Sequence, residues 1–347
     1  MKEAVKDLLE SVEFSNDETP YFKNKNYTSF NISNDYFHNI KSFDSDKKIC
    51  FIDGGNQEII GSHNFSLQLI RVYYNVYENN KKVSFDIFES LVLINVKKRN
   101  NELCFVTKIF PIKNKKNEKL SLDNFSFDIY DGTLKKGNDE VSVSSIGDAM
   151  RRFYEISLAK FICDKKLCDV IILDGSLEVK ITSEKEVMQS LYDSSKLNNV
   201  SIFSLSKTSS IFTNSGKSLL AVLNSIGPRI ESWYYYPIVK IKSETHKSEI
   251  YIVKLHEKSN YVFKFEKYIE SEMNIEEILS LLKKNSNDAV FLGYPYGLID
   301  ADRFARVSNN EIEIWKMKLL STLGKDFEKI RYTLNSKNAH SILDNIG

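Results

Sequence analysis

Hydrophobic and polar residues alternate along four runs in the first third of this chain. The runs cover residues 47–53, 64–78, 83–97 and 102–112. Alternation with a period of two is typical of strands that bury one face. Two polar segments between the runs, residues 79–82 and 98–101, have the composition of hairpin turns. The pattern therefore predicts an antiparallel meander.

A helical period replaces this alternation in the middle of the chain. Residues 145–165 are predicted to form a helix, which either Ser145 or Asp148 could cap. The continuous apolar run at 169–175 is typical of a strand that is buried on both faces of a parallel sheet. We therefore expect the chain to leave the meander through a helix and to return in a parallel strand.

This order of elements is that of a ribonuclease H-like core. The chain continues the order with a predicted helix at 184–196 and a predicted strand at 200–206. Strands that are joined through helices run parallel in one sheet. We therefore predict an α/β protein with a mixed sheet, in which an antiparallel meander and parallel strands are covered by flanking helices.

The remaining segments are predicted to surround this core. Residues 1–46 are polar and aromatic, with a helix at about 2–13, and are interpreted as an appendage that could contact a partner. An aromatic β region is predicted as an insertion around 225–290. Its expected strands are residues 232–242, 248–255 and 260–268.

The C-terminal third is predicted to finish the core. Its expected elements are helices at 275–285, 297–307 and 310–323 and a strand at 289–294. The predicted core domain is therefore 47–325, and residues 326–347 form a tail.

Composition describes an ordinary globular protein, because 42% of the residues are hydrophobic and 27% are charged. The N-terminus lacks the apolar stretch of a signal peptide, and no apolar run is long enough to cross a membrane. We expect a cytoplasmic protein without a membrane segment. A net charge of +1 means that any contact with DNA must come from a local patch, an aromatic platform or a partner.

Three acidic residues occur where a ribonuclease H-like core would bring them together. Asp53 ends the first predicted strand, Glu155 lies on the first core helix and Asp174 ends the first parallel strand. Ligands of open α/β sheets bind beyond the carboxyl ends of strands. Glycines follow both aspartates, where the backbone must approach closely or take a positive φ. Carboxylates are the ligands that hold two divalent ions for phosphodiester cleavage.

Simpler interpretations exist for each residue taken alone. Glu155 could pair with Arg151 or Arg152 one turn earlier in a surface ion pair. An Asp-Gly pair at the end of a strand often forms only a turn. The joint placement of the three acids favours a site.

The chain resembles the NurA nuclease family in several motifs. They are Phe51-Ile52-Asp53-Gly54-Gly55, residues 172–177, residues 205–209 and the segment from Gly293 to Arg306. The resemblance extends from about residue 47 to 325. It implies a ribonuclease H-like homodimer that cleaves single- and double-stranded DNA with Mn²⁺, or with Mg²⁺. It also implies partnership with the hexameric translocase HerA in DNA end resection.

The resemblance assigns catalytic roles to four acidic residues. Asp53, Glu155 and Asp174 are the implied metal ligands. Asp302 stands where the family often has a histidine, on a helical face with Leu298, so it could complete the catalytic set. The alternative is an ion pair between Asp302 and Arg306 one turn later.

Lys207 is an expected DNA-binding residue, and the resemblance implies Tyr236 and Arg306 as further ones. Lys207 ends a predicted strand beside hydroxyl residues that could contact phosphates. Residues 233–236 could stack on unpaired bases, although alternating aromatic residues of a strand more often fill a core. The alternating residues Tyr261, Phe263 and Phe265 are predicted to be core.

Residues 214–218 resemble the end of a phosphate-binding loop, but Ile211 replaces its first glycine. The motif therefore predicts no ATPase, and energy for translocation must come from a partner.

Two other functions remain open from the sequence. The chain could be an inactive adaptor that keeps the fold and docks on a translocase. It could also be a ribonuclease or a guide-dependent nuclease on the same fold.

Overall fold

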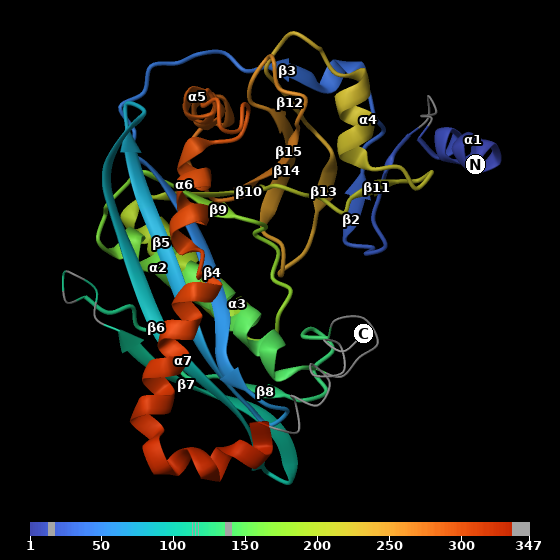
Figure 1. The fold of residues 1–347 in the computed structure, drawn as a ribbon. Helices are drawn as coiled ribbons and strands as arrows, with labels where there is room; N and C mark the ends of the chain where they lie inside the picture. Colours follow the sequence, from blue (N-terminus) through green and yellow to red (C-terminus); the bar gives the residue numbers. More distant parts are fainter. Residues whose placement is uncertain (13–17, 113, 115, 117, 136–140, 335–347) are drawn as a thin grey trace.

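One mixed sheet of eleven strands organises the part of the chain that the computed structural model describes, residues 1–12, 18–112, 114, 116, 118–135 and 141–334 (Figure 1). The strand order is β3-β12-β14-β15-β10-β9-β4-β5-β6-β7-β8. The meander strands are β4 (Ile49–Gly61), β5 (Phe65–Glu78), β6 (Lys81–Arg99), β7 (Glu102–Ile112) and β8 (Ser126–Asp128). The predicted antiparallel meander is confirmed.

Strand β4 is longer than predicted. It does not end at Asp53, because Asp53 pairs with Tyr73 and the pairing with β5 continues to Gly61. Strand β4 pairs with β9 only as far as Ile52, but β5 continues to satisfy its backbone hydrogen bonds beyond that residue. The apolar pattern alone does not reveal this extension.

The predicted crossovers follow the meander. They are α2 (Val143–Asp164), β9 (Val170–Asp174), α3 (Glu184–Asn198) and β10 (Ser201–Ser206). Strands β4, β9 and β10 are parallel neighbours, which confirms the ribonuclease H-like order. Ser142 caps α2, in place of the predicted Ser145 or Asp148, because its hydroxyl accepts the N–H of Ser145.

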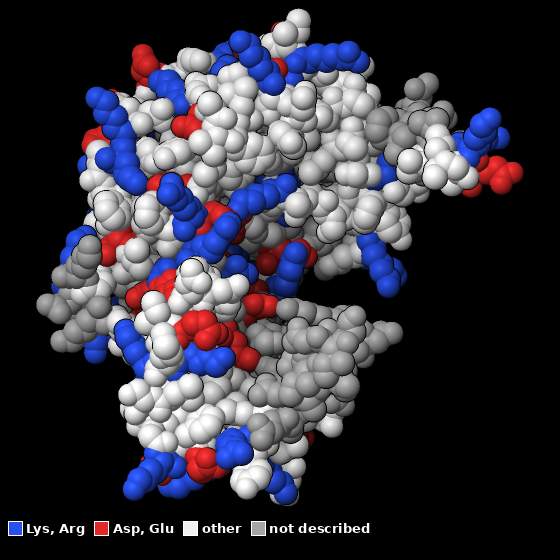
Figure 2. All heavy atoms as spheres, viewed as in Figure 1, with Lys and Arg blue, Asp and Glu red and all other residues white. Residues whose placement is uncertain are grey.

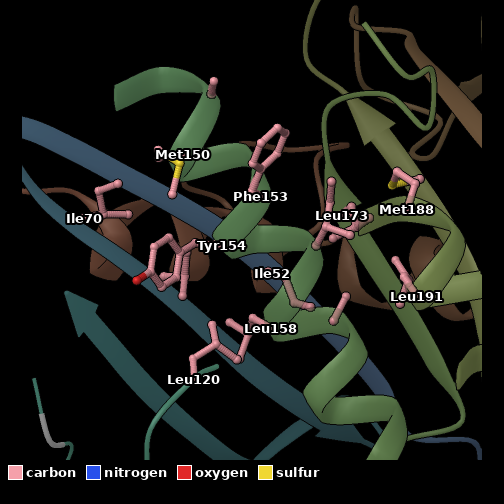
Figure 3. Packing of buried hydrophobic residues seen from close by; sticks show 14 of the residues in the cluster. Ile52, Ile70, Leu120, Met150, Phe153, Tyr154, Leu158, Leu173, Met188 and Leu191 are labelled. Carbon is pink, nitrogen blue, oxygen red and sulfur yellow. The ribbon is translucent and has the colours of Figure 1, made fainter. Parts of the chain in front are cut away.

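Helices cover both faces of the central strands (Figure 1). Side chains alternate across β4, so Ile52 packs against α2 on one face and Phe51 packs toward α6 (Tyr296–Ala305) on the other. Figure 3 shows the first core, to which the strands contribute Ile52 and Leu173 and helix α2 contributes Tyr154 and Leu158. The sheet end that carries the acids is therefore held between two helical layers.

The aromatic strands extend the central sheet. They are β12 (Trp233–Tyr235), β13 (Val239–Ile241), β14 (Ser248–Lys254) and β15 (Phe263–Tyr268). Strand β15 pairs with β10, so this region continues the main sheet, whereas only β13 lies outside it. Phe263 and Phe265 are buried as predicted, but the prediction for Tyr261 is wrong, because it precedes β15 and is 58% exposed.

The N-terminal segment joins the fold. After α1 (Lys2–Val12), strand β1 (Pro20–Tyr21) pairs with β11 (Phe212–Thr213), β2 (Tyr27–Ser29) pairs with β13, and β3 (Phe37–Asn39) pairs with β12. A 3₁₀ turn, η1 (Asn34–Tyr36), precedes β3. Residues 20–39 are therefore part of the sheets, which corrects the appendage predicted over 1–46. Polar composition concealed these short strands.

The C-terminal helices match their predictions closely. They are α5 (Ile275–Asn285), α6 and α7 (Asn309–Leu323), followed by η2 (Gly324–Asp326). Helix α4 (Leu219–Ile226) was not predicted. The strand predicted at 289–294 is wrong, since Gly293 has φ +91° and the segment forms turns before α6. The end of the predicted tail, 335–347, lies outside the described residues. Among the described helices, none is both long and apolar enough to span a lipid bilayer.

Candidate active site

Asp53 and Asp174 lie side by side at the end of the parallel pair of β4 and β9. They directly follow the paired residues Ile52 and Leu173. Side chains alternate along a strand, so both aspartates project from the face that carries Phe51, toward α6. Asp53 is 7% exposed, although it carries a carboxylate.

Helix α6 brings Asp302 to the same place. One carboxylate oxygen from each of Asp53, Asp174 and Asp302 can be chosen so that all three atoms lie within 4.8 Å of one another. Hard oxygen atoms that converge in this way form a suitable ligand set for Mn²⁺ or Mg²⁺. The residue expected to replace a family histidine thus lies with the two strand aspartates.

Two glycines allow α6 to approach β4 this closely. A Cβ at Gly55 would lie 2.3 Å from the backbone oxygen of Ala305, and one at Gly297 would lie 2.1 Å from the ring of Phe51. Of the glycines that follow the strand aspartates, Gly175 has the predicted positive φ, +104°. Gly54 and Gly55 instead allow close packing.

Glu155 approaches Asp53 from the opposite face of the sheet. A Cβ at Gly54 would lie 2.6 Å from Glu155 Oε1, so the missing side chain admits this carboxylate. Glu155 is 6% exposed and lies 3.9 Å from an Arg151 nitrogen and 3.7 Å from an Arg152 nitrogen. The alternative ion pairs therefore exist, and the Glu155 end of both is buried, whereas the Arg151 side chain is 38% exposed. Glu155 lines the same pocket as Asp53 without joining the cluster of three aspartates.

Lys207 neutralises part of the aspartate cluster. Its Nζ lies 2.9 Å from Asp174 Oδ2 and 2.9 Å from Asp302 Oδ1. Burial opposes its charge, but Asp174 and Asp302 outweigh burial and raise the pKa of Lys207 above the ordinary value. Asp302 also pairs with Arg306 at 3.1 Å, as its alternative interpretation predicted. An ion pair and a place in the cluster are thus compatible.

The cluster remains short of positive charge at Asp53. Burial, then Asp174 and Glu155, raise the pKa of Asp53 to about 8. Burial also raises the pKa of Glu155, despite its two arginine neighbours. A divalent cation would offset these like charges, so the residues fit the metal that the resemblance implies.

Tyr294 is a further member of the site that the sequence predictions missed. Its hydroxyl is buried and has no hydrogen-bond partner in the described part of the chain. Burial, followed by Asp174 and Asp53, raises the pKa of Tyr294 well above the ordinary value. Lys207 Nζ lies 5.8 Å from its ring centroid. The Gly293-Tyr294-Pro295 motif was a signal for this residue, but it did not indicate a role.

Tyr236 lies apart from the acids. Its ring stacks on Tyr251 with the centroids 4.5 Å apart, and its hydroxyl donates to Glu249 at 3.0 Å. It lines neither pocket that contains Asp174. The three preceding aromatic residues are buried, so they fill core rather than offer stacking platforms. A DNA contact by Tyr236 stays a prediction.

Two adjoining pockets meet at Asp174. One, of about 500 Å³, contains Asp53 and Glu155; the other, of about 710 Å³, contains Lys207. Figure 2 shows acidic and basic atoms facing one another in a hollow at the middle of the molecule. The arrangement can hold cations beside a place for phosphate, as phosphodiester cleavage requires.

Comparisons with known proteins show the family and the fold of this chain. Residues 47–307 match the model of the NurA domain family. The crystal structure of the NurA nuclease from Sulfolobus solfataricus is similar, with a TM-score of 0.55 at 18% identity over 94% of this chain and 95% of that one. No curated protein matches this chain.

Weaker structural similarity extends to endonuclease V. The catalytic domain of the human enzyme has a TM-score of 0.39 at 11% identity, over 80% of this chain and 84% of that one. The enzyme from Ciona intestinalis has a TM-score of 0.36 at 12% identity, over 77% and 86%.

Proposed function

Because the chain belongs to the NurA domain family, we propose that it is a metal-dependent DNA nuclease. The observation that carries the proposal is the convergence of Asp53, Asp174 and Asp302 at the end of the parallel strands. Carboxylates in this arrangement suit metal-assisted phosphodiester hydrolysis. An inactive adaptor would have no need for an Asp53 carboxylate that is 7% exposed and lies beside two other aspartates.

Each side chain of the site has a proposed role. Asp53 and Asp174 would hold metal together with Asp302 on the α6 side, and Glu155 would contribute from the α2 side. Bound divalent ions supply activation of water and stabilisation of the leaving oxygen. Lys207 lies at the boundary of the two pockets, where its ammonium group can orient a phosphate for attack.

The finer points of the proposal rest on the family alone. We infer Mn²⁺ as the preferred metal, with Mg²⁺ as the alternative. We also infer a homodimer that works with a HerA-type hexameric translocase in DNA end resection. The proposed DNA contacts of Tyr236 and Arg306 have the same basis.

A cleavage assay with matched variants tests the function. Wild-type protein is expected to degrade labelled DNA with Mn²⁺, whereas Asp53→Asn and Asp174→Asn remain folded and lose this activity. Asp193→Asn changes an exposed aspartate on α3 and should cleave like wild type. Undiminished cleavage by either active-site variant would contradict the proposed site.

Cleavage assays with DNA and RNA side by side distinguish the two other functions, the inactive adaptor and the ribonuclease. Wild-type protein that degrades neither DNA nor RNA with Mn²⁺ or Mg²⁺ would support the adaptor. Faster cleavage of RNA than of DNA would support a ribonuclease.

A further inference from the structure

The larger pocket forms a groove that leads away from the active site. One wall is formed by the last residue of β10 and the loop after it, residues 206–211, and the other by residues 21–24 and Tyr27 of the N-terminal segment. Its volume of about 710 Å³ is within the range of pockets that enclose a small organic ligand. It reaches the active site at Asp174 and Lys207. We call it the basic groove.

The charged residues of the basic groove differ from those of the acidic pocket beside it. Its wall has four lysines and two carboxylates, namely Lys23, Lys180, Lys207, Lys264, Asp174 and Glu178. Lys207 and the three hydroxyl residues that follow it, Thr208 to Ser210, also line this wall. Lysines and hydroxyl groups are typical contacts of a nucleic-acid backbone.

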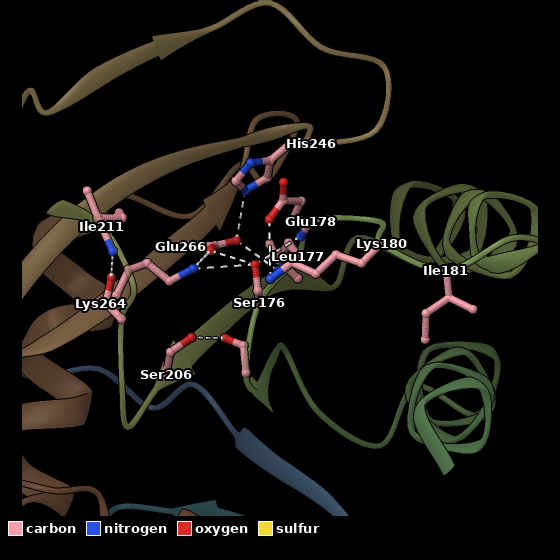
Figure 4. Close-up of polar contacts among 12 residues, drawn as sticks. Ser176, Leu177, Glu178, Lys180, Ile181, Ser206, Ile211, His246, Lys264 and Glu266 are labelled. Atoms are coloured by element: carbon pink, nitrogen blue, oxygen red, sulfur yellow. Dashed lines mark hydrogen bonds and ion pairs between the residues drawn. The ribbon is translucent and has the colours of Figure 1, made fainter. Parts of the chain in front are cut away.

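A buried network fixes the floor of the basic groove (Figure 4). Glu266 is fully buried and accepts hydrogen bonds from the Leu177 N–H at 2.8 Å, from Ser176 Oγ at 2.9 Å and from Lys264. His246 Nε2 lies 3.1 Å from the same carboxylate. The network holds the loop after Asp174 against β15. The groove is therefore a preformed feature of the fold.

Two exposed aromatic residues lie at the edge of the basic groove. Tyr21 of β1 pairs directly with Phe212 of β11, and their exposed fractions are 60% and 51%. Residues that are directly opposite in antiparallel strands project from the same face. Tyr21 lines the groove, and Phe212 follows Ile211 of its wall. Exposed aromatic rings beside a basic groove are the usual platforms for unpaired bases.

We propose that the basic groove binds single-stranded DNA, with phosphates along Lys207 to Ser210 and bases stacked on Tyr21 and Phe212. The inference rests on the proposed function, because it assumes a DNA substrate at the adjoining acids. Stacking requires unpaired bases, so the groove selects a single strand over a duplex. It delivers that strand to Asp174.

Binding of a short fluorescein-labelled oligothymidine tests the proposal, measured by anisotropy in an Asp53→Asn background that leaves the probe intact. Replacing both Tyr21 and Phe212 by alanine should weaken binding about tenfold or more. Exchanging them for other aromatic residues, Tyr21→Phe with Phe212→Tyr, should restore it. Tyr130→Ala is the control, because Tyr130 is 67% exposed and lines neither pocket.

A lysine pair tests the backbone contact. Lys23 lines the basic groove, whereas Lys25 is exposed two residues later and does not. Lys23→Gln should reduce the slope of log affinity against log salt by about 0.7, and Lys25→Gln should leave the slope unchanged.

The results of these binding tests distinguish the proposed role of the basic groove from the proposed nuclease activity. Three results would each contradict the proposal that the basic groove binds single-stranded DNA. They are unchanged binding by the double alanine variant, equal binding of a blunt duplex, and no binding by the Asp53→Asn protein. Groove-dependent binding by a protein whose wild-type form cleaves no DNA would support the groove and contradict the proposed function.

Discussion

The aspartates of the site differ in their electrostatic surroundings. Burial and neighbouring acids raise the pKa of Asp53 to about 8. Burial also disfavours the charge of Asp302, but the hydrogen bond from Lys207 and the charge of Arg306 outweigh it and lower the pKa of Asp302. Asp302 is therefore ionised at neutral pH, as its proposed role as a metal ligand requires. Its exposed fraction of 38% leaves it accessible to an ion.

Asp302→Asn should reduce metal-dependent cleavage by about 100-fold or more, because even residues that only orient a metal ligand contribute 10- to 100-fold. The rate of DNA degradation with saturating Mn²⁺ measures this effect. Full activity in Asp302→Asn, with Asp193→Asn as control, would show that Asp302 serves only its ion pairs with Lys207 and Arg306.

Glu266→Gln should lower the free energy of unfolding by about 3 kcal/mol at neutral pH, because it removes the buried charge that compensates the largely buried ammonium group of Lys264. Burial alone would raise the pKa of Glu266, but His246 and Lys264 lower it below the ordinary value. A carboxyl with a lowered folded pKa stabilises the fold fully above the unfolded pKa, and this contribution decreases progressively as the pH falls from the unfolded pKa through the folded pKa.

Urea denaturation at about pH 7 and about pH 3.5, on either side of the ordinary glutamate pKa of about 4.3, measures the difference between the wild type and Glu266→Gln. The difference should shrink at the lower pH. Glu270→Gln is a matched control, since Glu270 forms an exposed ion pair with Lys196, and such pairs contribute less than about 1 kcal/mol. A difference independent of pH would contradict the electrostatic role.

At the level of elements, the position of α6 on β4 determines where Asp302 lies. The contact between Gly55 and the backbone of Ala305 is too close for any side chain. Gly297 makes the corresponding contact with Phe51 at the start of the helix. Backbone atoms cannot yield by changing rotamer, so an added methyl group must move the helix.

Gly55→Ala should therefore displace the end of α6 and Asp302 with it. A displacement of about 1 Å can reduce the rate of an enzyme about 100-fold, and overpacking costs about 1–3 kcal/mol of stability. Cleavage rate and thermal unfolding measure the two effects. Gly132→Ala is the matched control, because its Cβ would meet nothing within 4 Å. Wild-type activity in Gly55→Ala would show that α6 does not determine the site geometry.

At the scale of the whole molecule, the proposed metal site joins parts of the chain that fold into different layers. Asp53 and Asp174 come from the sheet, Asp302 from the helices on one face and Glu155 from the helix on the other. A ligand that binds only the folded arrangement stabilises all of these contacts together.

Mn²⁺ should therefore raise the unfolding temperature of the wild-type protein, and a chelator should reverse this effect. The stabilisation is about 2.7 kcal/mol when free metal is 100 times its dissociation constant. Thermal unfolding measures this without any nuclease assay. Asp174→Asn should lose the shift and Asp193→Asn should keep it. The same shift in both variants would indicate that the metal binds elsewhere.

Most of the core could be predicted from the sequence. Strands β5 and β7 and helices α2, α3 and α5 to α7 follow from the spacing of apolar residues, since that spacing reports which face of an element is buried. Residues 20–39 could not be predicted, because their strands are short and polar and gain stability from pairing with distant segments.

The sequence by itself determined the strands and helices of the core and identified Asp53, Glu155, Asp174 and Asp302 as candidates, because apolar periodicity and motifs are local properties. Only the tertiary structure decided which acids meet. It placed Asp302 with the two strand aspartates and buried Tyr294 beside them. It also placed the Glu155 carboxylate against Gly54, where a side chain would leave no room for it. The physical reason is that these distances depend on how segments far apart in the sequence pack together. The periodicity of a single chain does not record that packing.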